Sequence, residues 1–270
     1  MNLFTIDLED WFCLHNIPGF AGLDWDSCKL RLADPTRRLL EILKKREVKA
    51  IFFVLGYIAD RAPDLIREIA DEGHEIASHG YEHRLLFTQS EAEFEHDVSR
   101  SLESLARIGF TRVRGYRAPH FTMNERTPWG PPILSKLGFE YSSSLYPTNM
   151  NWEYGAKGDR REIFRYECGL LEIPLCAAKI LNFLLPCSGG AYFRFAPYPF
   201  FKKLAEISSR QSNHYAFYIH PWELDPGQPR INTSLMGTVK HYYNLGATEI
   251  KLSQLIEDIS FAKINIEKLC

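Results

Sequence analysis

Cysteine is scarce in this sequence and follows no regular pattern. The 270 residues include six cysteines, and no two of them form a CxxC pair or a zinc-finger spacing. Disulfide frameworks and structural zinc sites both depend on such regular cysteine patterns. We therefore predict that the thiols are reduced and that burial of apolar side chains stabilises the fold.

Neither sign of charge is in excess. Lysine and arginine number 32 and aspartate and glutamate number 34, so the net charge is 32 − 34 = −2, and no basic stripe stands out along the chain. Proteins that follow a phosphate backbone concentrate positive charge on one face. We therefore expect no nucleic-acid partner.

Long apolar runs are also missing. The longest uncharged ones, residues 50–59 and 180–187, fall short of the roughly 18 residues that cross a bilayer. Acidic side chains stand at positions 7, 9 and 10, and the positive segment and apolar run of a secretory signal are absent. We therefore expect a cytoplasmic protein without a transmembrane segment.

The sequence has enough apolar residues for a packed core, with 45% hydrophobic and 13% aromatic residues. Short runs rich in Ile, Val and Phe alternate with longer segments of helical periodicity, which predicts repeated strand–helix units. The expected strands are residues 3–6, 49–55, 74–78, 113–116, 139–142, 170–174 and 214–220. The expected helices are residues 35–45, 63–71, 90–108, 128–137, 198–209 and 252–262.

No repeat of fixed period and no Pro-, Gly- or Ser-rich linker divides the chain. We therefore expect one domain over residues 1–270. Within it, residues 146–170 are predicted to be an irregular insertion that includes Trp152 and Tyr154, and residues 231–270 a C-terminal helical extension. Six or seven strand–helix units are typical of a parallel barrel or a doubly wound sheet.

Polar clusters stand at the ends of the expected strands. They are residues 7–10, 78–83, 114–121, 142–144 and 220–225. In parallel barrels and doubly wound sheets, the residues that carry chemistry collect at the carboxyl ends of the strands. Five clusters at five strand ends therefore predict a functional site at that edge of the sheet.

Two histidines, His79 and His83, stand four residues apart in the segment His-Gly-Tyr-Glu-His. If a helical turn begins there, both imidazoles project from one face at a separation that one metal ion bridges. Two imidazole nitrogens and one carboxylate oxygen leave coordination positions open for water and substrate. The same spacing occurs on ordinary helix surfaces, but its position at a strand end favours a hydrolytic metal site.

The order of these motifs resembles that of a known family. The motif Asp-x-Glu-Asp-Trp at 7–11 is followed by the histidine segment at 79–83, by Arg-x-Pro-x-Phe at 117–121 and by a late strand that ends in His220. The chain resembles the polysaccharide deacetylase family (NodB homology domain, carbohydrate esterase family 4), and in particular its branch associated with exopolysaccharide gene clusters. The resemblance spans residues 3–230, almost the whole chain.

The resemblance implies an α/β fold, a distorted (β/α)7 barrel of the NodB type. It also implies a metal-dependent hydrolase that removes N-acetyl groups from an amino sugar of a polysaccharide, or of its glycan precursor, and releases acetate. The expected substrate is therefore an N-acetylated sugar or glycan.

By the same resemblance, Asp7 is the general base, His220 is the general acid, and Arg117 pairs with Asp7. An arginine beside an aspartate favours its ionised form, which is the form that accepts a proton. The family pattern normally supplies a further aspartate that orients the histidine, whereas this chain has Tyr-Ser-Ser-Ser at 141–144. What orients His220 therefore stays open.

The resemblance also places a carboxylate beside His79 and His83 on one divalent metal ion. This sequence departs from the commonest form of the motif, which has two adjacent aspartates, so the carboxylate ligand is Glu9 or Asp10. Strand alternation favours Glu9, because it shares a side with Asp7. Zinc suits two imidazoles and a carboxylate, and cobalt, nickel and iron are alternatives.

Four further residues are predicted to contact the substrate: Pro119, Phe121, Tyr192 and Trp222. The first two belong to the third motif, in which the backbone N–H near Phe121 is expected to point at the oxyanion. Tyr192 and Trp222 are aromatic residues near the expected mouth of the site, where rings stack on sugars, although aromatic residues fill cores more often.

Two other functions fit the same scaffold. One is a catalytically silent carbohydrate-binding module, which has no need of Asp7, Arg117 and His220 together. The other is a different amide hydrolysis, such as the opening of a small cyclic amide or the deformylation of a sugar. The fold alone does not decide between these functions.

Overall fold

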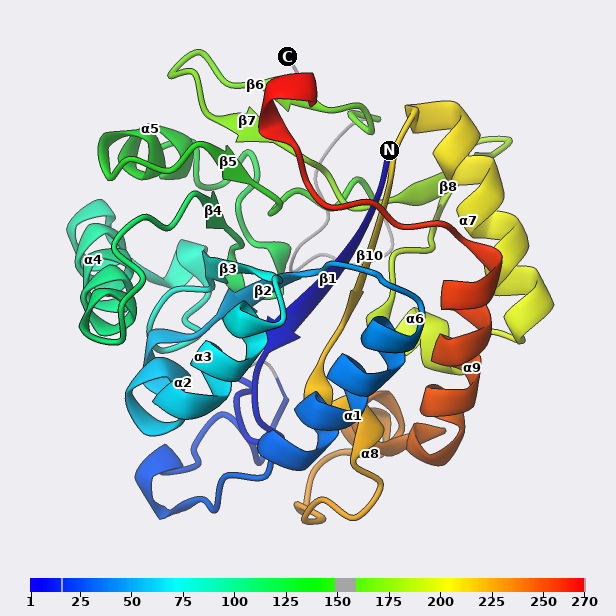
Figure 1. Cartoon of the computed structure of the whole chain (residues 1–270), viewed down its shortest axis with the longest axis horizontal. Helices are drawn as coiled ribbons and strands as arrows, with labels where there is room; N and C mark the ends of the chain where they lie inside the picture. The colour runs from blue at the N-terminus through cyan, green and yellow to red at the C-terminus, as the bar shows by residue number, and fades with distance from the viewer. Residues whose placement is uncertain (16, 149–158, 270) are drawn as a thin grey trace.

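A curled sheet of mostly parallel strands forms the centre of the structure, a computed structural model that describes residues 1–15, 17–148 and 159–269 (Figure 1). Among these residues seven strands run parallel, and an eighth pairs antiparallel at one edge. The order is β10 (Tyr215–Ile219), β1 (Asn2–Leu8), β2 (Ile51–Val54), β3 (Glu75–Ser78), β4 (Gly115–Tyr116), β5 (Tyr141–Ser142), β7 (Leu171–Glu172) and the antiparallel β6 (Phe164–Arg165).

Helices surround the outer side of this sheet (Figure 1). They are α1 (Ala33–Lys45), α2 (Gly56–Arg61), α3 (Pro63–Asp71), α4 (Glu91–Arg107), α5 (Gly130–Lys136), α6 (Gly190–Phe195), α7 (Tyr198–Ser212), α8 (Leu235–Tyr242) and α9 (Leu245–Asp258). Short 3-10 helices occupy Trp25–Ser27, Leu86–Thr88, Pro119–Phe121, Pro221–Leu224 and Ile266–Leu269. A curled parallel sheet inside a ring of helices confirms the predicted distorted (β/α)7 barrel.

The barrel is incomplete between β7 and β10, which no strand pairing joins among the described residues. A hairpin of β8 (Ala177–Ile180) and β9 (Phe183–Pro186) follows β7, and the segment after it fills the opening. There, the N–H of Tyr218 donates to the carbonyl of Ser188 at 2.7 Å. Gly189 has a φ of 145°, and a Cβ at this position would lie 1.8 Å from the carbonyl oxygen of Tyr218. Only glycine therefore fits where the chain closes the barrel.

Local sequence explains several of the element boundaries. The side chain of Ser90 accepts from the N–H of Glu93, and the side chain of Glu93 accepts from the N–H of Ser90, so a capping box begins α4. Pro63 begins α3, where its missing N–H costs nothing. The sequence does not predict the short helix α2, because its first residues, 56–59, continue the apolar run of β2.

The C-terminal part differs from the predicted pattern. The helix expected at 252–262 is α9, which begins at Leu245 and ends at Asp258, where the chain becomes extended at Ile259. A second helix, α8, precedes it within the predicted extension. The predicted insertion 146–170 contains the short strand β6, while Trp152 and Tyr154 lie outside the described residues.

The inside of the barrel has an apolar layer below a polar one. Leu3, Ile51 and Phe53 pack together inside the sheet, while their strand neighbours pack against the helices. Nearer the carboxyl ends of the strands the interior side chains are polar, and the guanidinium of Arg117 lies 4.1 Å from the centre of the Phe53 ring. The apolar layer therefore forms the floor of the polar region in which the predicted site residues lie.

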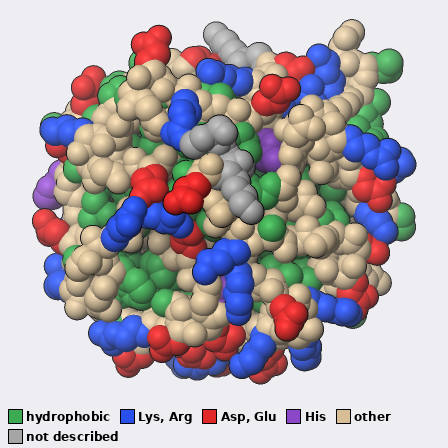
Figure 2. Space-filling view, turned by 45° about the horizontal axis from the view of Figure 1, so that its top comes forward, with side chains coloured by type: hydrophobic (Ala, Val, Ile, Leu, Met, Phe, Trp, Pro, Cys, Tyr) green, Lys and Arg blue, Asp and Glu red, His purple; other side chains and the backbone are tan. Residues whose placement is uncertain are grey.

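The surface carries charges of both signs. Figure 2 shows basic and acidic side chains intermixed over one face of the molecule, as expected for a net charge of −2. The described cysteines are all free, as the sequence predicted. Within the described residues, no helix combines the length and apolar character that a membrane span requires.

His74 makes the stability of the fold depend on pH. Its Nδ1 accepts the N–H of Ala50 at 3.0 Å, so the ring is neutral in the folded state, and burial together with Lys49 lowers the pKa of His74 to about 4. An unfolded histidine has a pKa of about 6.5. Between these values only the unfolded chain takes up the proton. The contribution of His74 to the free energy of unfolding is therefore complete above pH 6.5 and is lost as the pH falls towards 4.

We predict that His74→Gln weakens this pH dependence. The wild-type chain should lose free energy of unfolding between pH 7 and pH 4.5 by about 1.4 kcal/mol for each unit of pKa shift at His74. Denaturant unfolding of both proteins at the two pH values measures the difference. An equal loss in the variant and the wild type would contradict the assignment.

Candidate metal centre and catalytic cleft

A cavity of about 310 Å³ opens at the carboxyl ends of the parallel strands. Several predicted site residues line it, namely Asp7, Glu9, His83, Phe121, Tyr192, His220 and Trp222. Asp7 belongs to β1, Glu9 follows β1 directly, and His220 follows β10, which pairs with β1. The strand ends therefore converge on one cleft, as the clusters in the sequence predicted.

Glu9, His79 and His83 meet at the base of this cleft. Oε1 of Glu9 lies 3.1 Å from Nε2 of His79 and 2.9 Å from Nε2 of His83, and all three side chains are buried. One ligand atom from each residue lies within 4.8 Å of the others. Burial opposes ionisation of Glu9, but the neighbouring imidazoles hold its pKa well below the ordinary value. The arrangement suits a small divalent cation.

The hydrogen bonds of these side chains fit a metal site. Nδ1 of His79 lies 2.7 Å from the carbonyl oxygen of Arg117, and because a carbonyl only accepts, that nitrogen carries the proton. The lone pair of His79 is therefore on Nε2, which faces Glu9, as in metal-ligating histidines. Oε2 of Glu9 and Nδ1 of His83 are buried without a partner among the described residues. A bound cation would offset part of the cost of burying this carboxylate.

The histidine segment is a loop and not the helical turn considered above. Gly80 and His83 have φ values of 75° and 56°, outside the helical region. The carboxylate of Asp97, on α4, accepts the N–H groups of Tyr81 and Glu82 at 2.9 and 3.2 Å and so holds the loop. The two imidazoles converge because of this loop geometry. The sequence gives no local sign of the role of Asp97.

Asp10 does not belong to the site. One of its carboxylate oxygens accepts the N–H of Trp11, and the other accepts the N–H groups of Arg31 and Leu32, just before α1. Glu9 faces the histidines because β1 ends at Leu8 and the N–H of Glu9 turns back to the carbonyl of Asp7 at 2.9 Å. The geometry therefore selects Glu9 over Asp10, through a turn and not through the strand alternation invoked above.

Arg117 and Asp7 form a buried ion pair beside this centre. Nη1 of Arg117 donates to Oδ1 of Asp7 at 2.7 Å, and the remaining guanidinium bonds go to Thr5 and Ser143. A buried ion pair is tolerated only when such hydrogen bonds satisfy both ions. Oδ1 of Asp7 is therefore held in place, while Oδ2 lies 3.8 Å from Nε2 of His220 on the side of the cleft.

A glutamate within its own motif orients His220. Nδ1 of His220 bonds to Oε1 of Glu223 at 2.8 Å, and Oε2 of Glu223 accepts from Nε of Arg194 at 2.6 Å. Arg194 in turn donates to backbone carbonyls at the end of α8. Although burial opposes protonation, the charges of Glu9, Glu223 and Asp7 raise the pKa of His220 to about 9. Glu223 thus occupies the place that the missing aspartate left open.

The sequence did not single out Glu223 or Arg194 individually. A detectable sign was the pairing of His220 with an acidic residue three positions later, at the start of a 3-10 helix. The partner Arg194 lies in α6, 29 residues before Glu223. Its role depends on a long-range contact that no local pattern reveals.

Trp222 is not placed to stack on a sugar. Its ring is sandwiched between the imidazoles of His220 and His241, with centroids 5.0 and 4.4 Å away and interplanar angles of 22° and 27°. The two stacked imidazoles therefore occupy indole surface that a sugar ring would need, although Trp222 does line the cavity. Its observed role is to support the His220 ring from one side.

The third motif also differs in detail from the prediction. Pro119 is buried and does not line the cavity. The N–H of Phe121 donates to the carbonyl of Ala118 at 3.0 Å and so is not directed at a substrate oxygen. The ring of Phe121 and the side chain of His120 do line the cavity. Tyr192, on α6, lines it as well, as the sequence predicted.

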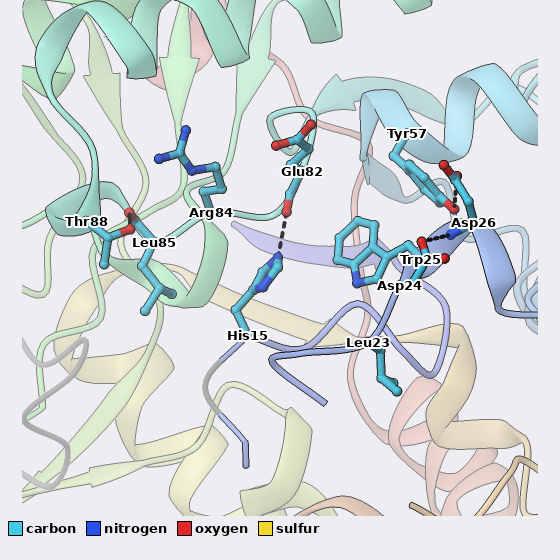
Figure 3. A pocket seen from close by; sticks show the side chains of 10 residues that line it. All are labelled: His15, Leu23, Asp24, Trp25, Asp26, Tyr57, Glu82, Arg84, Leu85 and Thr88. Carbon is cyan, nitrogen blue, oxygen red and sulfur yellow. Dashed lines mark hydrogen bonds between the residues drawn. The ribbon is translucent and has the colours of Figure 1, made fainter. Parts of the chain in front are cut away.

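A second pocket of about 540 Å³ lies on the far side of the histidine loop (Figure 3). His15 stands in it, with Nε2 2.8 Å from the carbonyl oxygen of Glu82 and its ring stacked on Trp25 at 5.2 Å. The same imidazole stacks at 6.2 Å on His83. This pocket therefore lies behind the Glu9–His79–His83 group, and neither Asp7 nor His220 lines it.

Two family models cover most of the sequence. Residues 18–142 match the model described as polysaccharide deacetylase, and residues 143–267 match a domain of unknown function, DUF3473. The chain is therefore similar to the polysaccharide deacetylase family over residues 18–142, just under half of its length. The first model contains His79, His83 and Arg117, whereas His220 and Glu223 lie in the second.

One similar protein supports this resemblance, and one similar structure supports the fold. The peptidoglycan-N-acetylglucosamine deacetylase of Bacillus cereus is 36% identical over 102 residues, which are 38% of this chain and about a third (34%) of that protein. A Mycobacterium smegmatis protein assigned to the polysaccharide deacetylases has a similar structure, with a TM-score of 0.63 and 23% identity over 99% of this chain and 87% of that one.

Two further similar structures show how widely this fold is used. An allantoinase has a TM-score of 0.63 and 15% identity, over 99% of this chain and 88% of its own. A pseudoenzyme of the CE4 family from Bacillus anthracis has a TM-score of 0.53 and 16% identity, over 100% of this chain and 64% of its own. At these identities the likeness shows the fold alone.

We predict that Glu9→Ala and Asp10→Asn change different properties of the chain. Loss of Glu9 should reduce zinc affinity by at least about 100-fold, because it removes a ligand and not an outer-shell partner. Asp10→Asn should retain zinc binding but lower the free energy of unfolding by about 1–3 kcal/mol, because it weakens three backbone hydrogen bonds. Calorimetric zinc titration and denaturant unfolding measure the two effects. Loss of zinc binding in a folded Asp10→Asn protein would refute the choice of Glu9.

Proposed function

We propose that the chain is a metal-dependent N-deacetylase of an amino sugar in a polysaccharide or its glycan precursor. One observation carries the proposal: the Glu9–His79–His83 group, the Asp7–Arg117 pair and the His220–Glu223 pair lie together at one cleft. A silent binding module does not need all three. The similarity to the Bacillus cereus peptidoglycan-N-acetylglucosamine deacetylase supports an N-acetylated sugar as the substrate class.

Glu9, His79 and His83 would hold the cation. When bound there, a divalent cation supplies Lewis-acid polarisation of the amide carbonyl and makes water more acidic. We propose zinc, because two imidazoles and one carboxylate are ligands that zinc prefers, with cobalt, nickel or iron as alternatives. The protonation of His79 at Nδ1, fixed by the carbonyl of Arg117, supports this role.

Asp7 is proposed to accept the proton of the attacking water. Oδ1 is held by Arg117 at 2.7 Å, so the proton goes to Oδ2, the oxygen nearer His220. The bond to Arg117 fixes the direction of this carboxylate, and the apolar floor below Arg117 keeps the guanidinium from turning away. A positioned general base of this kind contributes about 10²–10⁴ to the rate.

His220 is proposed to donate a proton to the leaving amine. Nδ1 is bonded to Glu223, so the proton to be transferred is on Nε2, which faces the cleft 3.8 Å from both Asp7 and Glu9. The stacking of Trp222 on the ring restricts its rotation. After the C–N bond breaks, the products are acetate and the free amino sugar.

Acetate release by the zinc-loaded chain over a panel of N-acetylated oligosaccharides tests the proposal. The same assay includes N-formyl sugars and small cyclic amides, which separate the two other amide hydrolyses from deacetylation. We expect acetate release from at least one N-acetyl glycan and no turnover of the cyclic amides. Binding of glycans without any turnover would identify the silent module and overturn the proposal.

We predict that Asp7→Asn and His220→Ala each reduce kcat by about 10²–10⁴, the usual contribution of a positioned base or acid. Both variants should still bind zinc, because neither residue belongs to the Glu9–His79–His83 group. Acetate release and zinc content of the two purified proteins provide the measurements. Near wild-type turnover in either variant would remove that residue from the mechanism.

We also predict that Glu223→Gln moves the alkaline limit of activity to lower pH. Glu223 is one of the charges that raise the pKa of His220, and glutamine keeps an acceptor for Nδ1–H but not the charge. Because His220 acts as an acid, kcat/KM falls as the pH rises through its pKa, and this fall should begin earlier in the variant. Profiles of kcat/KM against pH check this, with Glu206→Gln, on α7 and remote from the cleft, as the control. Identical profiles for Glu223→Gln and wild type would rule out the coupling.

A further inference from the structure

Helix α8 has its apolar side chains on the side that faces water. Leu235, Met236 and Val239 are 82%, 75% and 37% exposed. The buried face of the same helix is formed by Gly237, His241 and Tyr242. A surface helix normally buries its apolar side chains and exposes polar ones. The reversed pattern of α8 suits a helix whose outer face meets an apolar phase.

This exposed face borders the cleft. Met236 and Lys240 of α8 line the cavity that contains Asp7 and His220. Tyr243, directly after the helix, stacks on Phe195 with ring centroids 4.9 Å apart, and both rings are partly exposed. The apolar face therefore continues from α8 to the end of α6. We call Leu235, Met236, Val239, Tyr243 and Phe195 the apolar rim.

The charges near the apolar rim are positive. Between Pro226 and Thr248 the only lysine, arginine, aspartate or glutamate residues are Arg230 and Lys240. The segment 17–23, which contacts this region where Gly19 approaches the carbonyl of Asn232, carries no charged side chain. An apolar face with basic residues and no carboxylates is typical of elements that lie at the surface of an anionic bilayer.

We propose that the apolar rim docks on the surface of an anionic lipid bilayer and brings the mouth of the cleft to the headgroups. The side chains of Leu235 and Met236 enter the boundary between headgroups and acyl chains, while Arg230 and Lys240 meet the lipid phosphates. A symmetric contact between two copies would instead bring the basic residues of both copies to one apolar seam, where they repel. Charge complementarity therefore favours the bilayer over a second copy.

This inference goes beyond the proposed function and does not depend on it, because docking needs no catalytic group. It has a consequence for the reaction: glycans attached to lipid reach a docked cleft more readily than free polymers do. Effective concentration at the surface raises the rate for such substrates without any new contact to the sugar.

Sedimentation with vesicles tests the docking. We expect the wild-type chain to bind vesicles of phosphatidylcholine mixed with phosphatidylglycerol, and to bind pure phosphatidylcholine vesicles several-fold more weakly. Each basic residue near an anionic surface contributes roughly fivefold, so Arg230→Gln should lose about that factor on the mixed vesicles only. Higher salt should weaken binding in the same way.

The double variant Leu235→Ser and Val239→Ser should lower the affinity for mixed vesicles roughly tenfold or more. Neither residue lines the cavity, so its activity on a soluble substrate should be unchanged. The matched control is Leu181→Ser with Phe183→Ser, two side chains 84% and 69% exposed in the β8–β9 hairpin. Figure 1 shows this hairpin and α8 at opposite ends of the molecule, so the control should bind vesicles as the wild type does.

Three outcomes would overturn the proposal. The first is that the wild-type chain fails to bind mixed vesicles. The second is that the α8 variant and the hairpin variant lose binding equally. The third is that sedimentation equilibrium detects a dimer that the α8 variant dissociates while vesicles bind nothing, which would identify a second copy as the occupant. An inactive chain that still binds vesicles through α8 would instead refute only the proposed function.

Discussion

One buried arginine connects the two chemical parts of the cleft. The guanidinium of Arg117 holds Asp7 at 2.7 Å, and the carbonyl of the same residue bonds to Nδ1 of His79 at 2.7 Å. Its N–H donates to the carbonyl of Ser78, at the end of β3. The proposed base and one candidate ligand therefore take their positions from a single residue. A shift of the backbone at Arg117 would change both at once.

The buried guanidinium of Arg117 is stable at this position because neighbouring groups accept its hydrogen bonds and balance its charge. Taking a charge out of water is costly, and an ion pair repays the cost only with good geometry and further hydrogen bonds. Thr5, Ser143 and Asp7 accept from the guanidinium, and the ring of Phe53 lies beneath it. The serine-rich segment at 142–144, which the sequence shows in place of an aspartate, thus supplies acceptors to the arginine.

The sequence predicts the site well where the site residues directly follow the ends of parallel strands. Asp7, His83 and His220 could be placed together because carboxyl ends of parallel strands share one edge. It predicts less well where a turn or a distant partner decides. One turn after β1 decides that Glu9, and not Asp10, faces the histidines. The surroundings of the Trp222 ring depend on His241, 19 positions later.

The same limit applies to the orientation of His220. A motif-based comparison looks for an aspartate near position 142, but a carboxylate that approaches an imidazole from any direction serves the same purpose. Here Glu223, in the 3-10 helix that directly follows His220, bonds to the imidazole, and Arg194 neutralises the charge of Glu223. Because Arg194 is held by the carbonyls at the end of α8, the C-terminal half contributes to the geometry of the proposed acid, His220.

The charges of the cleft also bear on the proposed cation. Three carboxylates, on Asp7, Glu9 and Glu223, face two arginines and His220, so the group is neutral when His220 is protonated. This balance accounts for a His220 pKa of about 9 in the absence of a cation.

Oε1 of Glu9 lies 3.8 Å from Nε2 of His220, so a divalent cation held by Glu9 would oppose protonation of His220 and lower that pKa. An acid works best with a pKa near the working pH. The cation would therefore both polarise the amide and bring His220 into the range in which it gives up its proton.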